Sequence, residues 1–464
     1  MRNKMKLPAA LLALSMVPAL AGQVYTKEEA VRVALEKSSD IKEAEETLIS
    51  ARSQVDQGYG SAYPQIDLSA TYARTFGVHD VRKTSTVQDM LDAAATDNEK
   101  MLAGVADNVN YALTAMGSGY RWGTSVGLTA TQLLYAQGQV TSGINVAKAY
   151  QKLTEISLES EKETVRFNVE NSFDELIYLD SSIVIIQASI DQVQANLDYV
   201  IQAKESGLAS ELDVIRAQLS LEELKSTLAN TEKNRVVARN SLLNTMGLPW
   251  DSDVSFTGDL IDPSEGGFAM PDTNFAHIRE RRKELKQLDA SEEMYEHNIT
   301  LSKAGYKPTV VLGGSITYSD GKNRAFKWDA PDWDDNISKQ IYLSVSMNLF
   351  NGMSTREGVV QAKSSLRTAQ IQKESAERGI KLEVESAVNT FQDAIRQIEI
   401  QKGQVDLAQR NYDLTEAAYK VGRETQLNLL DASTSLRSAK LNYMSAIVDW
   451  NNAYNTLRKA TGEY

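Results

Sequence analysis

The sequence predicts an α+β membrane protein built from two internal structural repeats, with four β-strands per chain and long coiled-coil helices. Three observations predict this fold class. Matching residues recur along the chain at a constant separation, which indicates an internal repeat. Each repeat has two segments that alternate between apolar and small polar residues, as strands do. Each also has long stretches without proline in which apolar residues follow heptad spacing, as rod-like helices do.

The repeat is defined by five matches, each at a separation of 215 positions. They are Leu134-Tyr135 with Leu349-Phe350, Val169-Glu170 with Val384-Glu385, Gly207 with Gly422, Ala217 with Ala432, and Gly247 with Gly462. Further upstream, Tyr63-Pro64 matches Lys307-Pro308 at a separation of 244. The first copy therefore carries 29 additional residues between its proline and its second strand.

These matches divide the chain into segments. Residues 1–21 are predicted to be a signal peptide, because Arg2, Lys4 and Lys6 precede an apolar stretch that ends in the cleavage pattern Ala19-Leu20-Ala21. Residues 22–247 form the first repeat and residues 274–464 the second. Residues 248–273 contain three prolines and a Gly-Gly pair, which is the composition of a linker. Each repeat is expected to run helix, strand, loop, strand, long helix, turn, long helix.

Four segments carry the strand pattern, and in each the apolar residues share one face. The apolar residues are Ile66, Leu68, Ala70 and Tyr72; Val126, Leu128 and Ala130; Val310, Leu312, Ile316 and Tyr318; and Ile341, Leu343, Val345, Met347 and Leu349. One apolar and one small polar face is the pattern of a membrane barrel with a wet lumen. A soluble β-sandwich also has alternating strands, so the strands alone are compatible with either a membrane barrel or a soluble sandwich.

The helical stretches favour the membrane reading. Apolar residues run with four-three spacing from Ile186 to Val200, and Leu429, Leu436, Tyr443, Trp450 and Leu457 recur every seven residues. Helices of this length pack side by side as rods and do not form a compact domain. The run Arg279–Glu284 alternates basic and acidic residues, which predicts a salt-bridged helix face.

Four strands cannot close a barrel, and an open sheet would leave unpaired backbone groups in lipid. Other copies of the chain are therefore expected to complete it. Two copies would give eight strands around a lumen filled by side chains, and three would give twelve strands around an open passage. We favour three copies, although composition alone does not choose between the two.

Composition excludes several classes of function. The net charge is −13, and −16 once residues 1–21 are removed, which argues against nucleic-acid binding. The chain has no cysteine, so disulfides, thiolate metal sites and cysteine nucleophiles are excluded. Its three histidines lie far apart, and nucleotide-binding and serine-hydrolase motifs are absent. We therefore expect no enzyme, no cofactor and no metal site.

The chain resembles the TolC family of outer-membrane efflux proteins along nearly all of its mature length. Asn348–Gly352 reads NLFNG, similar to the strand ending of that family. Tyr419–Leu436 reads YKVGRETQLNLLDASTSL, similar to the family's helical hairpin signature, and Glu205–Gln218 is a weaker copy of it. The resemblance implies a homotrimer, in which a 12-stranded barrel in outer-membrane lipid is continued by a long α-helical coiled-coil barrel in the periplasm.

The resemblance also assigns positions within this architecture. Pro64 and Pro308 would mark the helix-to-strand transitions, and residues 248–273 an equatorial belt. Residues 77–119 and 320–338 would be external loops. Gly207 and Gly422 would lie in the hairpin turns at the periplasmic tip.

Near the second hairpin the resemblance implies an acidic ring around a periplasmic aperture. Asp431 matches one acidic position, and Asn428 stands where the family often has a second aspartate. A tie between the two hairpins is expected from Tyr419, Asp213 and the neighbours Arg423 and Glu424, with Glu424 at the position where the family has arginine.

The expected function is that of a passive exit duct of a tripartite efflux pump or type I secretion system of a Gram-negative bacterium. The expected partners are a periplasmic adaptor protein and an inner-membrane pump or ABC exporter. The alternative is a non-conducting coiled-coil scaffold or adaptor of the cell envelope, which would have no need of four strands of membrane length.

Overall fold

The computed structural model describes residues 23–76, 91, 95–117, 121–136, 138–263, 268–322 and 336–464. The predicted signal peptide, part of the first predicted external loop, most of the second and the Gly266-Gly267 pair lie outside these residues. The chain divides into two compact units, each assembled from both halves of the sequence. The first contains Met1–Ser53, Lys148–Met294 and Ser365–Tyr464, and the second contains Gln54–Ala147 and Tyr295–Ser364.

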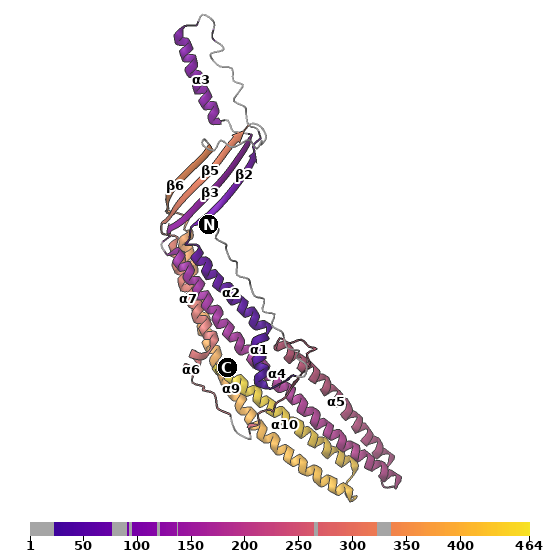
Figure 1. Ribbon diagram of the computed structural model, residues 1–464. Coiled ribbons are helices and arrows are strands. Elements are labelled where there is room, and N and C mark those ends of the chain that lie inside the picture. The colour runs from indigo at the N-terminus through magenta and orange to yellow at the C-terminus, as the bar shows by residue number, and fades with distance from the viewer. Residues whose placement is uncertain are drawn as a thin grey trace, which may run out of the picture. The chain divides into compact units, whose positions relative to one another are not determined.

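The second unit contains a four-stranded antiparallel sheet with the strand order β2-β3-β5-β6 (Figure 1). The strands are β2 (Gln65–Arg74), β3 (Trp122–Tyr135), β5 (Thr309–Lys322) and β6 (Ile337–Ser346). Helix α3 (Asp97–Gly117) lies in the connection between β2 and β3. All four predicted strands are therefore present and belong to one sheet.

One strand ends earlier than its alternation predicts. β6 stops at Ser346, so Met347 and Leu349 lie beyond it. Ser346 pairs with Thr309, the first residue of β5, and the residue before Thr309 is Pro308. Because proline has no backbone N–H to donate, the ladder of hydrogen bonds cannot continue past this pair.

The first unit is helical, and four long helices form two hairpins. They are α4 (Gln139–Glu205) with α5 (Glu211–Thr245), and α9 (Ser354–Lys420) with α10 (Gln426–Thr461). α4 and α9 run through both units and contain 67 residues each, which is roughly 100 Å of helix. Their first residues and their last residues are both 215 positions apart.

Four shorter helices precede the strands: α1 (Lys27–Lys37), α2 (Ser39–Gly60), α6 (Phe275–Arg281) and α7 (Lys283–Ala304). A pair of three-residue parallel strands, β1 (Gln23–Tyr25) and β4 (Val254–Phe256), adds an element that the sequence pattern did not indicate. β4 lies inside the predicted linker.

The helices are held by buried apolar clusters that match the heptad prediction. One cluster, from Tyr25 to Val254, includes Phe173 and Leu176 of α4 with Leu242 of α5 and Met246, the residue directly after α5. Another joins α9 and α10 through Phe391, Trp450 and Leu457, which are all at most 1% exposed. A third lies near the end of the first hairpin and contains Val193, Leu197, Val200, Val214, Ala217, Leu221 and Leu224.

Among the described residues one helix, α4, has a stretch long and apolar enough to cross a membrane by length and composition alone. Of that stretch 44% is buried within the chain. α4 also supplies residues to two of the apolar clusters, including Phe173 and Val193. Its apolar residues therefore serve helix packing.

Two glycines with left-handed backbones end the hairpins beside the short helices. Gly247 follows α5 at φ 69°, and Gly462 follows α10 at φ 70°. A Cβ on Gly247 would collide with the carbonyl of Lys37, 2.7 Å from its carbon. A Cβ on Gly462 would lie 2.9 Å from Cβ of Arg281. Each long hairpin thus ends directly against the break between two short helices.

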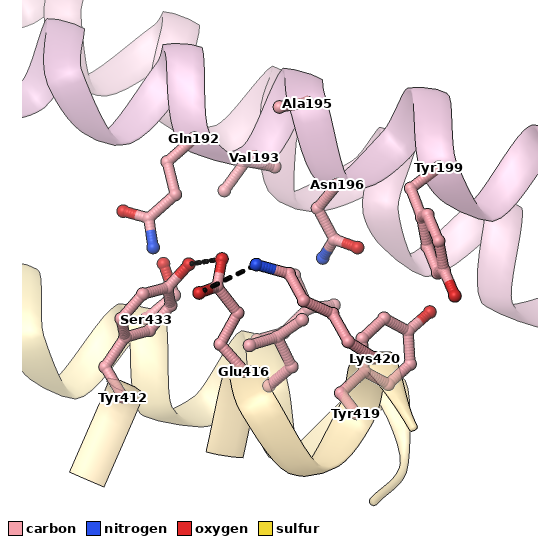
Figure 2. Close-up of a pocket in the computed structure, with 12 residues that line it drawn as sticks. Gln192, Val193, Ala195, Asn196, Tyr199, Tyr412, Glu416, Tyr419, Lys420 and Ser433 are labelled. Carbon is pink, nitrogen blue, oxygen red and sulfur yellow. Dashed lines mark hydrogen bonds and ion pairs between the residues drawn. The ribbon is translucent and has the colours of Figure 1, made fainter. Parts of the chain in front are cut away.

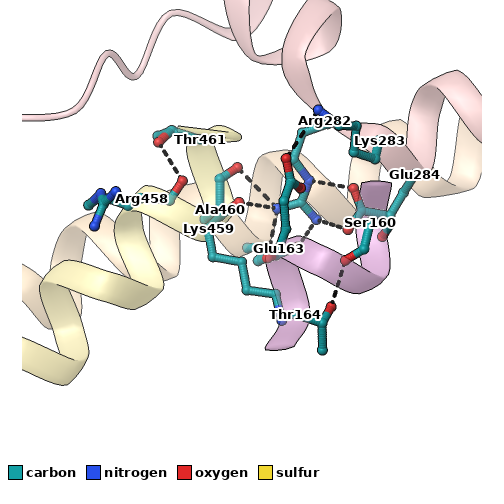
Figure 3. Close-up of polar contacts among 11 residues, drawn as sticks. Ser160, Glu163, Thr164, Arg282, Lys283, Glu284, Arg458, Lys459, Ala460 and Thr461 are labelled. Carbon is teal, nitrogen blue, oxygen red and sulfur yellow. Dashed lines mark hydrogen bonds and ion pairs between the residues drawn. The ribbon is translucent and has the colours of Figure 1, made fainter. Parts of the chain in front are cut away.

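Arg282 occupies the second of these breaks and corrects the expectation of a continuous helix face there. α6 ends at Arg281 and α7 starts at Lys283, and the Arg282 side chain is only 7% exposed (Figure 3). Its guanidinium donates to the carbonyls of Lys459 and Ala460, both at 3.1 Å, and to both oxygens of Glu383 at 3.0 Å. The last carbonyls of α10 have no N–H donors within the helix, and the Arg282 guanidinium supplies them. This contact between distant elements, and not the local charge pattern, sets the position of Arg282.

Candidate functional site

The sheet has one apolar face that extends across all four strands. Its register places Leu68 beside Leu128, and Leu128 beside Ile316. Leu312 likewise lies beside Leu343. These side chains are exposed within the single chain, Leu68 at 75% and Leu343 at 63%. Gln132 and Lys339 also lie on this face, and an exposed, mainly apolar face of this extent indicates contact with lipid or with another protein.

The opposite face carries small polar residues. It contains Asp67, Ser69 and Thr71 of β2, Ser125, Gly127 and Thr129 of β3, Ser315 and Thr317 of β5, and Tyr342, Ser344 and Ser346 of β6. Tyr342 lies directly across Gly313, where an added Cβ would collide with the tyrosine ring. Small residues keep this face flat and suited to contact with water.

Aromatic residues lie at both ends of the apolar face. At one end Tyr72 and Trp122 stack with ring centroids 5.5 Å apart, and the Arg74 guanidinium lies 4.9 Å above the Trp122 ring. Near the other end Tyr63 and Phe350 are 67% and 77% exposed. From Tyr63 to Tyr72 the chain extends about 30 Å if fully stretched, less across a tilted sheet. Aromatic girdles of this kind mark the two interfaces of a membrane-spanning strand.

The alternation of apolar residues does not by itself predict these aromatic residues at the two ends. It includes Tyr72 only as one apolar residue of a strand, and Trp122 lies just outside the predicted strand. The available signal was that aromatic residues flank the alternating segments.

Within the described residues the two outer strands of the sheet, β2 and β6, each have a strand neighbour on one side only. Their other edges present backbone N–H and C=O groups that have no strand partner in the described part of the chain. Such edges are templates for pairing with another copy.

The two hairpin turns have the same geometry. Gly207 and Gly422 both have φ 75°, and a Cβ at either would meet no atom within 4 Å. In each turn the glycine N–H and the next N–H bond back to the end of the preceding helix. Ser210 and Thr425 then cap the following helices. Glycine suits this turn because it accepts a left-handed backbone without strain.

The residues predicted to tie the hairpins together lie near these turns, and several bond locally. The Asp213 carboxylate accepts hydrogen bonds from the backbone and hydroxyl of Ser210, which lowers the pKa of Asp213. Glu424 accepts from the Asn428 amide at 2.6 Å. Asp431 is exposed on α10, and Pro64 and Pro308 directly precede β2 and β5.

Tyr419 lies at a contact between the two hairpins. Its ring meets Tyr199 of α4 edge-on, with centroids 5.7 Å apart (Figure 2). Burial, followed by the nearby Tyr199 and Asp213, raises the pKa of Tyr419. Beside this pair is a cavity of about 320 Å³ between α4, α9 and α10. Sequence reasoning missed Tyr199, because nothing in its local pattern shows which helix it faces.

A second polar group lines the same cavity. Glu416 accepts a hydrogen bond from the Tyr412 hydroxyl at 3.3 Å and forms an ion pair with Lys420 at 3.1 Å (Figure 2). All three residues belong to α9. At the start of α10, Gln426 is 4% exposed, and its amide atoms have no hydrogen-bond partner among the described residues. The region near the two hairpin turns thus combines aromatic contacts with a buried amide, that of Gln426, which has no hydrogen-bond partner among the described residues.

A family model described as "Outer membrane efflux protein" matches residues 30–248 and 276–463. The chain belongs to the outer membrane efflux protein family. It is accordingly an outer membrane protein, as the sequence predicted. Outer membrane protein TolC of Escherichia coli K12 is 25% identical over 440 residues, which cover 90% of this chain and 77% of that protein.

A second TolC protein shares less of its length, whereas two solved structures share more. TolC of Salmonella enteritidis is 26% identical over 324 residues, and the match spans 68% of this chain but only 64% of that protein. Among solved structures, the CmeC outer membrane channel of Campylobacter jejuni has a TM-score of 0.74 at 14% identity, covering 94% of this chain and 85% of its own. VceC of Vibrio cholerae has a TM-score of 0.70 at 15% identity, covering 94% and 96%. These likenesses establish the fold.

Proposed function

We propose that this chain is one subunit of a homotrimeric exit duct in the outer membrane. The duct would serve a tripartite efflux pump or a type I secretion system. The observation that carries the proposal is the four-stranded sheet, which has one mainly apolar face, one mainly polar face and two edges without a strand partner among the described residues. In lipid such edges must be paired, and sister copies of the same sheet supply the partners.

Three copies fit the sheet better than two. Three sheets close into a 12-stranded barrel, whereas eight strands leave room only for side chains. The polar face, with its serines, threonines and Gly313, then lines an open aqueous passage. The apolar face, bounded by aromatic residues at both ends, meets the lipid.

The helices continue the passage into the periplasm. The two hairpins of each subunit, six in the trimer, form an α-helical coiled-coil barrel below the membrane. In this arrangement residues 22–247 and 274–464 act as the two repeats, residues 248–273 form an equatorial belt, and residues 1–21 direct export and are removed.

The duct is opened at its periplasmic tip. The sequence carries no nucleotide-binding motif, so opening is driven by docking of a periplasmic adaptor and an inner-membrane pump or ABC exporter. Three Asp431 carboxylates at the aperture attract cations, and Asn428 makes this ring less acidic than a double ring of aspartates. Tyr419, Asp213, Arg423 and Glu424 hold the closed tip.

Planar-bilayer recording of the purified mature protein tests the proposal. We expect ion channels together with trimers on native gels. A monomer that conducts no ions would refute the duct, and trimers without conductance would favour the scaffold reading. In the same assay, Asp431→Ala reduces cation selectivity and block by multivalent cations. Unchanged selectivity would refute the role of Asp431 at the aperture and would leave the proposal of an exit duct intact.

A deletion strain tests the physiological role. Two relatives are an antibiotic efflux pump outer membrane protein of Pseudomonas putida and a pyoverdine export outer membrane protein of Pseudomonas aeruginosa. We expect the deletion to raise sensitivity to toxic small molecules or to abolish export of a metabolite or protein, with restoration by the wild-type chain. A deletion that changes none of these would contradict an export role.

A further inference from the structure

The 29 additional residues of the first repeat contribute a helix to one end of the sheet. α3 (Asp97–Gly117) lies between β2, which ends at Arg74, and β3, which begins at Trp122. Its start is well defined locally: the Thr96 hydroxyl accepts from the Glu99 backbone, and the Thr96 backbone donates to the Glu99 carboxylate at 2.7 Å. This is a capping box, which fixes a helix start. The second repeat has no counterpart of this insertion.

α3 has an apolar seam that is exposed within the chain. Leu102, Val105 and Val109 follow three-four spacing and are 70%, 55% and 52% exposed. The sequence continues the same spacing at Ala112 and Met116. Ala103, on another side of the helix, is only 4% exposed. Apart from Ala103, most of the described side chains of α3 are exposed, and its exposed apolar residues include a seam with the spacing of a coiled coil.

The chain connections place α3 relative to the proposed barrel. Because α3 joins the ends of β2 and β3, it emerges at the end of the sheet opposite to the long helices. In the proposed trimer, three copies of α3 then emerge at the same rim with the same direction. A threefold axis would bring three identical seams to face one another.

The charge of α3 argues against a lipid surface as the occupant of the seam. Membrane-surface helices carry Lys and Arg on their polar face and often tryptophan on the other. α3 has one basic residue, Lys100, against Asp97, Glu99 and Asp107, and no tryptophan. A negatively charged helix is repelled by anionic lipid headgroups. A narrow heptad seam instead matches another helix of the same kind.

We infer that the three α3 helices of one trimer pack together through Leu102, Val105 and Val109 as a parallel three-helix bundle above the outer mouth of the duct. This inference rests on the proposed function, because it needs three copies. A free helix of this length is marginally stable in water. Tethering to a common rim raises the effective concentration of the three helices, so a short seam suffices.

Cysteine crosslinking tests the bundle, and the absence of native cysteines makes every product attributable to the introduced residue. Two matched pairs are used: Leu102→Cys with Lys100→Cys, and Val105→Cys with Asp107→Cys. The members of each pair are two residues apart and therefore lie on nearly opposite sides of the helix. Mild oxidation of intact outer membranes is followed by gel electrophoresis without reductant, and trimer formation is checked on native gels.

We expect disulfide-linked dimers of the chain to be several-fold more abundant for the two seam variants than for their controls. A second measurement places Val109→Cys in a chain that also carries Leu102→Lys and Val105→Lys, and its dimer band should be lost. Trimers with equal dimer yields in seam and control variants would overturn the bundle and leave the duct standing. A crosslink from the seam to a different protein would also overturn it. Absence of trimers on native gels would instead refute the proposed function.

Discussion

Gly247→Ala tests whether the long hairpins are anchored at the breaks between the short helices. Gly247 has a left-handed backbone, and an added Cβ would run into the Lys37 carbonyl and approach the Ser38 nitrogen to 3.1 Å. Both obstacles are backbone atoms, which cannot turn away as a flexible side chain can. Gly207 is the matched control, because its φ is 75° but a Cβ there meets nothing within 4 Å.

The expected loss of unfolding free energy has two parts, the backbone strain of a left-handed residue and the steric clash of the added Cβ. A left-handed backbone costs an L-residue about 1–2 kcal/mol, and this cost applies equally to both glycines. Alanine also restricts the unfolded chain, which returns about 0.4–1 kcal/mol at both sites. Only Gly247 adds a steric cost, about 1–3 kcal/mol by analogy with overpacked cores. We therefore expect Gly207→Ala to lower the free energy of unfolding by about 1 kcal/mol and Gly247→Ala by about 3 kcal/mol.

Urea unfolding of the detergent-solubilised protein, followed by its helical circular dichroism signal, measures both variants under one condition. The quantity of interest is the difference between them, because it removes the shared strain. If Gly247→Ala proved no more destabilising than Gly207→Ala, the close approach to Lys37 would not exist in solution and the anchoring would be wrong.

Three further outcomes can be checked. Arg282→Met should lower the free energy of unfolding by about 2–4 kcal/mol, because Glu383 and the α10 carbonyls lose a buried charged donor. Arg282→Lys keeps the charge and should lower it less. Equal losses for the two variants in urea unfolding would contradict the role of the guanidinium hydrogen bonds. Burial raises the pKa of the Asp174 carboxyl, against the opposing effect of Lys27 at 2.5 Å, so the native state binds more protons than the unfolded state just above the ordinary aspartate pKa. The contribution of Asp174 to stability should therefore fall as the pH rises above about 4, and the urea-unfolding profile of Asp174→Asn should lack this fall; identical pH profiles would count against it. Gly313→Ala should displace the Tyr342 ring and reduce single-channel conductance, a result that unchanged conductance would contradict.

The sequence determined the strands and long helices well, because their periodicity reflects which faces are buried. The apolar alternation of Leu68 and Leu343 correctly predicted one shared face, and the heptads of Trp450 and Leu457 correctly predicted a helical seam. The matches at Gly207 and Gly422 fell on turns of identical backbone geometry. Such patterns predict structure well because a long strand or helix buries the same face along its whole length, so the signal is repeated many times in the sequence.

What the sequence did not predict depends on contacts between distant elements. Arg282 was predicted to lie on a salt-bridged helix face, and it does form salt bridges, yet it lies between two helices and is buried because the end of α10 needs donors there. Tyr199 gave no sign that it would face Tyr419. The brief β1–β4 pair joins segments about 230 residues apart, and its three-residue strands are too short to show a period.

The equal length of α4 and α9 limits how this protein can change size. Removing one heptad from both helices, and from their hairpin partners α5 and α10, would shorten each by about 10 Å and keep the seam residues in phase. Removing it from α4 alone would shift Tyr199 two turns away from Tyr419 and leave one hairpin projecting beyond the other. A change in helix length is therefore tolerated only when the same number of residues is deleted or inserted in both repeats, so the two hairpins must change length together.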